Sequence, residues 1–306
     1  MLRHLAIVIL LVGTGACNDG TDPSGPPTLH DRIVFVSNRS GGPRLYQMRL
    51  DGSGIAAIPQ DGLLTPFEPQ ISPDGEWIAF GDQFADVWVQ RVDGSEARNL
   101  IRGAVECGNV RWAPNGERLA LRCLESPTDD GDIWLVHADG SNLVPLTDDP
   151  AEDGSPTWSP NGDRVAFSTD RDGQHDLYAL DLATGGLENL TDTPGSDEHL
   201  PRWSPDGRWI AYVTDAPPLP ESHTSAFELI EMASGAVRRL YTQAPSGPHV
   251  GWAPDSRSVI FARRAVLPDE GDIVSLNTET GDLTEILPPD GFVDDRPSYG
   301  PRRFGH

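Results

Sequence analysis

Residues 201–212 read Pro-Arg-Trp-Ser-Pro-Asp-Gly-Arg-Trp-Ile-Ala-Tyr, and closely similar stretches stand at five other places in the chain. Four of these copies are whole, and they begin at Pro69, Val110, Pro156 and Gly251. The sixth copy is divided, because its first half is Pro297-Ser-Tyr-Gly-Pro301 and its second half, Ile33-Val-Phe35, stands near the N-terminus. The copies are roughly 40–50 residues apart, which is the period of propeller blades.

The unit from Pro156 to Asp192 shows what one copy encodes. Its first strand is short and ends at Ser159-Pro-Asn-Gly162, a turn in which Pro presets φ and Gly tolerates a left-handed backbone. Alternating residues predict three more strands, near 164–168, 176–180 and 187–190. Six such copies predict an all-β chain, a six-bladed β-propeller of four-stranded antiparallel blades.

The divided copy predicts how the ring closes. If the strand at Ser298-Tyr299 pairs with the strand at Ile33–Val36, one sheet holds both ends of the chain. Hydrogen bonds and buried aromatic side chains then close the ring without a covalent link. The alternative is an open or five-bladed array with ragged ends.

The N-terminal segment has the pattern of an exported protein. Residues 1–16 combine a basic start, an apolar run and small residues before a cleavage site, which is typical of a signal peptide. Residues 17–30 then form a Gly-, Pro- and Ser-containing tether, and residues 31–306 form the propeller. Cys17 directly after the small residues resembles the acylated cysteine of bacterial lipoproteins, although Thr14 replaces the usual bulky residue. The alternative is ordinary cleavage after Ala16, which leaves a free thiol.

Cys107 and Cys123 are the other two cysteines, and they flank the hairpin whose turn is Pro114-Asn-Gly116. Counted outward from the turn, they stand almost opposite each other. In an exported chain this predicts a cross-strand disulfide, and it leaves Cys17 as the odd cysteine for lipid attachment. The alternative is two free buried thiols.

The composition excludes some partners. The net charge is −24 and the pI is about 4.5, and no basic stripe offsets this, so we expect no binding to nucleic acid and no direct adhesion to anionic lipid. Contact with a membrane is expected only through the lipid anchor. Solubility is a sufficient reason for the charge, and cationic partners or divalent ions are compatible with it.

The blade topology predicts two unequal faces. Short turns occupy one face, and the loops between second and third strands and between blades occupy the other, which we call the loop face. Residues just before the innermost strands are expected at the mouth of the central channel: Glu68, Asp153, Glu198 and His199. Such a set is a candidate site for a divalent cation such as calcium, and the alternative is a solvated acidic rim. We expect no other cofactor.

Sequence signatures of catalysis are missing. The chain has no Gly-x-Ser-x-Gly elbow, His-Glu-x-x-His, Cys-x-x-Cys, phosphate-binding loop or dinucleotide fingerprint. The tryptophans at 112, 158, 203 and 252 occupy equivalent positions and are expected to pack between blades.

The stretches Phe167-Ser-Thr-Asp-Arg-Asp-Gly173 and Asp176-Leu-Tyr178, followed by the repeat at Pro201, resemble the TolB-type propeller repeat. The resemblance covers about residues 31–303 and implies the fold more strongly than a function. TolB itself has an α/β domain before its propeller, which we do not expect here, so its lipoprotein partner is not carried over.

These features predict a non-catalytic, monomeric scaffold that binds an envelope protein or peptide. It is expected to be periplasmic or anchored to the outer membrane of a bacterium as a lipoprotein. The alternatives are a lactonase-like or lyase-like propeller enzyme, or a ligand-binding module, with a divalent cation at the channel mouth.

Overall fold

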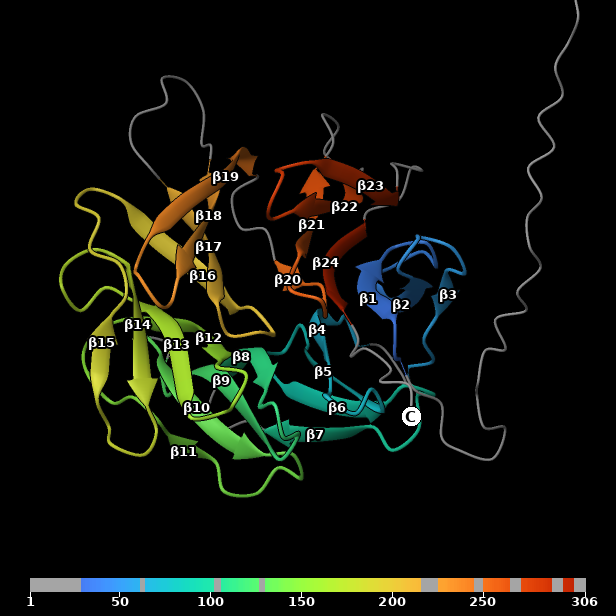
Figure 1. Cartoon of the computed structure of the whole chain (residues 1–306). Helices are drawn as coiled ribbons and strands as arrows, with labels where there is room; N and C mark the ends of the chain where they lie inside the picture. Colours follow the sequence, from blue (N-terminus) through green and yellow to red (C-terminus); the bar gives the residue numbers. More distant parts are fainter. Residues whose placement is uncertain are drawn as a thin grey trace, which may run out of the picture.

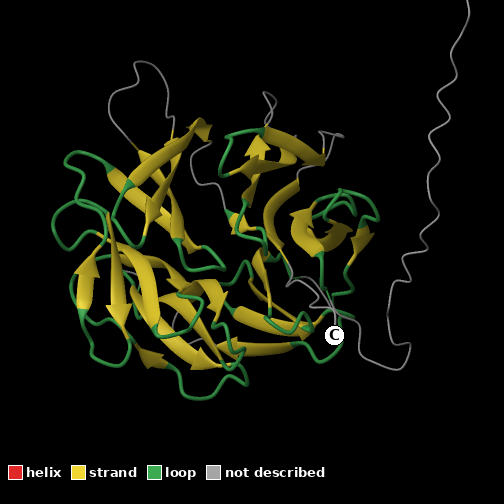
Figure 2. Ribbon diagram, in the orientation of Figure 1, coloured by secondary structure: helices red, strands yellow, loops and turns green. Residues whose placement is uncertain are grey.

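The structure is a computed structural model that describes residues 29–60, 64–101, 106–126, 130–215, 225–244, 250–264, 271–287 and 294–299. These residues form strands, turns and loops and contain no helix, and so none that could cross a membrane (Figure 2). The predicted signal peptide, the tether and Cys17 lie outside the described residues.

The strands form six four-stranded antiparallel sheets, as predicted. Figure 1 shows the sheets around a common centre, with one strand of each nearest the middle. These innermost strands contact one another in a closed ring. We number the sheets as blades 1 to 6 and list the strands of each from the innermost strand outward.

The first three blades follow the chain in order. Blade 1 has β4 (Phe67–Ile71), β5 (Trp77–Gly81), β6 (Val87–Arg91) and β7 (Arg98–Ile101). Blade 2 has β8 (Glu106–Trp112), β9 (Arg118–Leu124), β10 (Asp132–His137) and β11 (Val144–Pro145). Blade 3 has β12 (Asp153–Trp158), β13 (Arg164–Thr169), β14 (Asp176–Asp181) and β15 (Leu187–Asn189).

The last three blades include the one that joins the two ends. Blade 4 has β16 (Asp197–Trp203), β17 (Trp209–Asp215), β18 (Ser225–Glu231) and β19 (Val237–Ala244). Blade 5 has β20 (Gly251–Trp252), β21 (Ser258–Arg264), β22 (Gly271–Asn277) and β23 (Leu283–Leu287). Blade 6 has β24 (Asp294–Tyr299), β1 (Arg32–Ser37), β2 (Arg44–Arg49) and β3 (Ala56–Ala57).

Blade 6 confirms the predicted ring closure. Strand β24 pairs antiparallel with β1, with Ile33 opposite Tyr299 and Ser37 opposite Asp294. Arg39, just after β1, adds an ion pair across this junction, since its Nη2 donates to Asp294 Oδ2 at 2.8 Å. The innermost strand of this blade therefore comes from one end of the propeller and the other three strands from the opposite end.

The core lies between the blades, where equivalent apolar residues of the second strands are fully or almost fully buried. They are Phe35, Phe80, Leu121, Phe167, Tyr212 and Phe261. Individual clusters contain residues of neighbouring blades; one, for example, joins Ile133 of blade 2 to Trp158 and Val165 of blade 3. Because each blade buries its faces against its neighbours, the ring holds a single distributed core.

The repeat tryptophans connect adjacent blades, as their equivalent positions predicted. Trp158 Nε1 donates to the Arg111 carbonyl at 3.2 Å, and Trp252 Nε1 donates to the Arg202 carbonyl at 2.8 Å. Trp203 differs, since its indole donates to Gly207 in its own turn and its backbone N–H donates to Thr157 Oγ1. The repeat thus fixes the spacing between innermost strands as well as within blades.

Blade 2 contains the predicted disulfide. Cys107 of β8 stands directly opposite Cys123 of β9, and the two sulfur atoms are 2.05 Å apart. The bond joins the two innermost strands of the blade close to the loop face.

Candidate functional site

A β-bulge interrupts the innermost strands at one equivalent position. The bulge residue has a positive φ of 49–55° in each described case, although none is glycine: Glu68, Asn109, Ser155, Leu200 and Arg296. The strand register shifts at these positions in all five blades. Bulges bend a strand and redirect its side chains. These residues therefore form an irregular ring where the innermost strands approach the loop face.

A cavity of about 370 Å³ lies against this ring, and three successive blades line it. Three of its lining residues, Asn109, Ser155 and Leu200, are bulge residues. The other nine come from the adjoining strands and loops: Arg122, Glu152, Gly154, Ser168, His175, His199, Val213, Asp215 and Ser225. We call this hollow the loop-face pocket.

Two histidines give the loop-face pocket its chemistry. The rings of His175 and His199 contact each other, with centroids 4.7 Å apart. Burial lowers the pKa of His199, and the neighbouring His175 lowers it further, whereas the carboxylates around it oppose the shift. His199 is therefore neutral near pH 7 and can offer one donor and one acceptor to a ligand.

Charged groups of the pocket wall are already in contact with one another. Arg122 Nη2 donates to Glu152 Oε1 at 3.1 Å, and Glu152 Oε2 lies 3.9 Å from His175 Nε2. On the other side, Ser225 Oγ donates to Asp215 Oδ1 at 2.6 Å. The wall thus holds its donors and acceptors in place before any ligand arrives, which lowers the entropy lost on binding.

Asp153, one of the four predicted mouth residues, is fully buried and ion-paired. Arg171 Nη2 lies 3.2 Å from Asp153 Oδ1 and 3.0 Å from Asp149 Oδ2. Burial raises the pKa of Asp153, and the hydrogen bonds from Thr169 and Thr147 and the Arg171 charge oppose that rise. The pair of Arg39 and Asp294 in blade 6 repeats this arrangement. Asp153 therefore ties a loop to an innermost strand.

Glu198 is also buried, and it shares its surroundings with a second carboxyl group. Its Oε2 accepts a hydrogen bond from Thr191 Oγ1 at 3.2 Å. Burial, together with the charge of Asp176, raises the pKa of Glu198 to about 7. The remaining two predicted residues have other partners. Glu68 Oε2 lies 3.8 Å from Arg111 Nη1, and the ring of His199 contacts the ring of His175 at a tilt of 55°.

The four predicted mouth residues therefore do not gather into one site. Of them, only His199 lines the loop-face pocket. Within the described ranges, no group of three or more His, Cys, Asp or Glu side chains is placed to hold a metal ion. The sequence reasoning did not single out Arg122, Glu152, His175 or the bulge residues other than Glu68.

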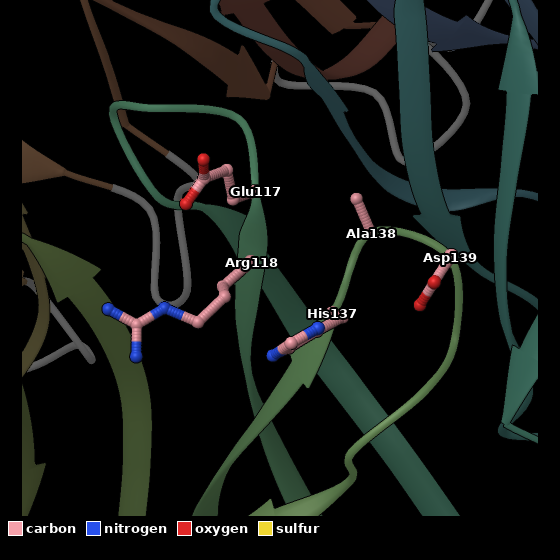
Figure 3. Close-up of a pocket in the computed structure, with 5 residues that line it drawn as sticks. All are labelled: Glu117, Arg118, His137, Ala138 and Asp139. Carbon is pink, nitrogen blue, oxygen red and sulfur yellow. The ribbon is translucent and has the colours of Figure 1, made fainter.

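A second hollow of about 530 Å³ lies on the opposite, turn-bearing face of blade 2. Figure 3 shows Arg118 and His137, which are cross-strand neighbours on β9 and β10, extending in the same direction. Asp139 at its edge accepts hydrogen bonds from the N–H and hydroxyl of Ser141, and these lower its pKa. Because the hydrogen bonds of Asp139 stabilise its own hairpin turn, we do not take this hollow as the candidate site.

One aromatic side chain in a loop of the loop face is highly exposed. Phe84, in the loop between β5 and β6, is 71% exposed, more than any other large apolar side chain of the described residues. The buried Asp82 holds this loop, since its carboxylate accepts hydrogen bonds from the N–H groups of Phe84 and Asp86 and from the Trp88 indole. The Ala85 carbonyl also accepts from Cys107 N at 2.9 Å, which fastens the loop to blade 2.

Fold and site together define a six-bladed propeller with a polar pocket at the channel mouth. A model of the TolB beta propeller domain matches residues 63–303, so the chain belongs to the TolB beta propeller family. None of the curated proteins matches the sequence.

Solved structures with the same fold serve different purposes. TolB from Acinetobacter baumannii has a TM-score of 0.75 and 19% identity, with 90% of this chain and 68% of that chain covered. Oligogalacturonate lyase from Vibrio parahaemolyticus has a TM-score of 0.60 and 13% identity, covering 85% and 76%. A chain of the nidogen/laminin complex has a TM-score of 0.64 and 9% identity, covering 86% and 98%. At these identities the likeness concerns the fold alone.

Proposed function

We propose that this propeller is a non-catalytic binding module whose loop face holds a segment of another protein of the bacterial envelope. The proposal rests on the exposure of the Phe84 side chain, in a loop whose conformation is fixed by hydrogen bonds to Asp82. Exposed aromatic residues on pre-organised loops are frequent anchors of protein interfaces, because they bury a large area at little entropic cost. Because the Phe84 side chain is largely exposed, it is available to a binding partner.

The loop-face pocket extends the proposed contact surface. Blade 1 carries Phe84, and blades 2 to 4 line the pocket, so the two features lie on the same side of neighbouring blades. A peptide that inserts an apolar group against Phe84 and polar groups into the pocket would meet donors and acceptors that are already oriented. Similarity to TolB and to a nidogen/laminin complex chain supports a binding role.

Site-specific photo-crosslinking in the native envelope tests this proposal. A photoreactive residue at position 84 should yield an adduct with one specific protein, and the same residue at Val237 should not. Val237 is the matched control because it is 51% exposed and belongs to β19, the outermost strand of blade 4. Substitution Phe84→Ala should weaken capture of that protein at least tenfold, or about 1.4 kcal/mol, with an unchanged unfolding temperature. Equal adducts at both positions would contradict the proposal.

We propose further that the protein is exported and anchored to the membrane through an acylated Cys17. The support is the signal-like pattern of residues 1–16 and the tether that follows. Mass spectrometry of the mature N-terminus tests this directly. A mass without diacylglycerol on Cys17 would exclude the lipid anchor. The protein would then be free in the periplasm.

A further inference from the structure

Two arginines occupy equivalent positions on the innermost strands of blades 2 and 4. Arg111 of β8 and Arg202 of β16 each stand directly before a repeat tryptophan, and each is only 6% exposed. Charged side chains are rarely buried to this extent unless an opposite charge or a set of hydrogen bonds accompanies them. The surroundings of both guanidinium groups are therefore informative.

The hydrogen bonds of both groups are incomplete. Arg111 Nη1 donates to the Val110 carbonyl at 2.6 Å, and Arg202 Nη1 donates to the Pro201 carbonyl at 2.7 Å. Both acceptors belong to the residue just before the arginine, so each side chain folds back on its own strand. Arg111 Nε and Arg202 Nη2 are buried and have no partner. A guanidinium has five N–H donors, and each buried donor left unpaired is costly.

Protein groups balance the two charges only in part. Arg111 Nη1 lies 3.8 Å from Glu68 Oε2, which is beyond hydrogen-bond distance. Burial lowers the pKa of Arg111, and the Glu68 charge only partly opposes this. For Arg202, no carboxylate oxygen of the described residues lies within 4.0 Å. For both buried guanidinium groups, opposite charges of the protein therefore compensate the free energy of desolvation little or not at all.

The loop-face pocket ends two residues from this region on both strands. Its lining residues Asn109 and Leu200 stand two positions before Arg111 and Arg202. Two residues of a strand span roughly 7 Å, so the backbones of both arginines lie about that far beyond the pocket lining, in the direction of the turn-bearing face. Ser155 and Thr157 hold the same two positions on β12, between them. A ligand group that enters the pocket can thus approach the arginines past polar side chains.

We propose that Arg111 and Arg202 form an oxyanion site among the innermost strands, reached from the loop-face pocket, that takes a carboxylate or a phosphate group. The planar guanidinium fork matches both groups with two parallel hydrogen bonds, which would satisfy the donors that the protein leaves unpaired. This site goes beyond the proposed protein binding and does not depend on it, because a small anion alone should occupy it.

Anion titration of the isolated protein tests the site. The protein is dialysed into an anion-poor buffer, and the unfolding temperature and the heat of binding are followed with added acetate, inorganic phosphate, or chloride at matched ionic strength. Acetate or phosphate should raise the unfolding temperature along a saturating curve that chloride does not reproduce. The arm with the higher affinity identifies the ligand class as carboxylate or phosphate. If neither exceeds chloride, water alone fills the site and the proposal is wrong.

Variants locate the effect. Arg202→Gln and Arg111→Gln should each weaken anion affinity at least tenfold, whereas Arg208→Gln should leave it within twofold. Arg208 is the matched control because its side chain is 65% exposed and lies 3.8 Å from Glu231.

Arg202→Met separates the binding role from a purely structural one. Because it removes a buried unpaired charge, this variant should unfold at a higher temperature than the wild type in anion-poor buffer and should not respond to anion. If Arg202→Met is instead destabilised and still responds like the wild type, the arginine is structural and the proposal is overturned.

Discussion

Glu198 and Asp176 are two carboxyl groups placed together where water hardly reaches. Their side chains are 1% and 2% exposed, and burial with the Asp176 charge raises the pKa of Glu198 to about 7. In the unfolded chain a glutamate titrates near 4.3. Between these two values the folded state keeps a proton that the unfolded state has lost. The free energy of unfolding therefore falls as the pH rises from about 4.5 to 7.

Substitution Glu198→Gln should remove this pH dependence, because an amide keeps the shape of a protonated carboxyl group and cannot ionise. We expect the variant to exceed the wild type by roughly 1–3 kcal/mol at pH 8 and to match it near pH 5. Urea unfolding from pH 5 to 8.5 measures the free energy of unfolding of the variant and of the wild type. Glu279→Gln, at an exposed turn, is the control and should follow the wild type. If the free energy of unfolding of Glu198→Gln falls with pH as steeply as that of the wild type, Glu198 is not the group responsible.

Single residues also show where sequence reasoning stops. Asp153 and Glu198 were expected just before innermost strands at the channel mouth. They are the first residue of β12 and the second residue of β16, and both are buried with protein partners. Arg171 reaches Asp153 from 18 residues further along the chain, and such a contact depends on how a loop folds back. The bulge residues had no shared signal, since Glu, Asn, Ser, Leu and Arg occupy the same backbone position. The direction of the side chains at this ring depends on the bulged backbone, and the residue types do not predict where the bulges occur.

At the scale of elements, the hairpin of β8 and β9 was largely predictable. Its turn residues placed Cys107 almost opposite Cys123. The bulge at Asn109, which the sequence did not predict, shifts the register by one residue, so that the two cysteines stand directly opposite each other and form the bond. Asn109, two residues after Cys107, and Arg122, directly before Cys123, line the loop-face pocket. The disulfide therefore holds one wall of that pocket in place.

Reduction of this disulfide should destabilise the protein. The bond closes a loop of 16 residues, for which the loss of chain entropy in the unfolded state is worth about 3 kcal/mol. Urea unfolding with and without dithiothreitol measures the difference, and the double variant Cys107→Ser/Cys123→Ser should reproduce it. Cys17→Ser serves as the control and should leave the response to reduction intact. A shift below about 0.5 kcal/mol would show that the bond contributes little.

For the whole molecule, the six copies and the divided sixth copy were sufficient to predict the ring. The period repeats in every copy, and the turn of Pro, Asp or Asn, and Gly repeats in four of them, so local preference largely agrees with the global fold. The pocket and the braced Phe84 loop were not predictable in the same way. They occur where copies differ from one another, in loops whose length and contacts are particular to one blade.

Deletion of residues 294–306 should open the ring. Blade 6 would lose β24 and with it the ion pair between Asp294 and Arg39. We expect the free energy of unfolding to fall by more than about 5 kcal/mol, a large share of what an ordinary domain possesses. Circular dichroism during urea unfolding measures the loss. Deletion of residues 1–28 is the control, with an expected change within about 0.5 kcal/mol. A shortened protein as stable as its parent would disprove closure by β24.

The junction of β24 with β1 has a consequence for the order in which the protein matures. Arg39 and Asp294, which meet there, are 255 positions apart in the chain. The early partner must wait until all five intervening blades and β24 are available, and contacts so distant in sequence form slowly. Until then β1 presents an uncovered edge that can recruit wrong strands. A chaperone that shields this edge would therefore be useful from the time β1 is made until β24 pairs with it.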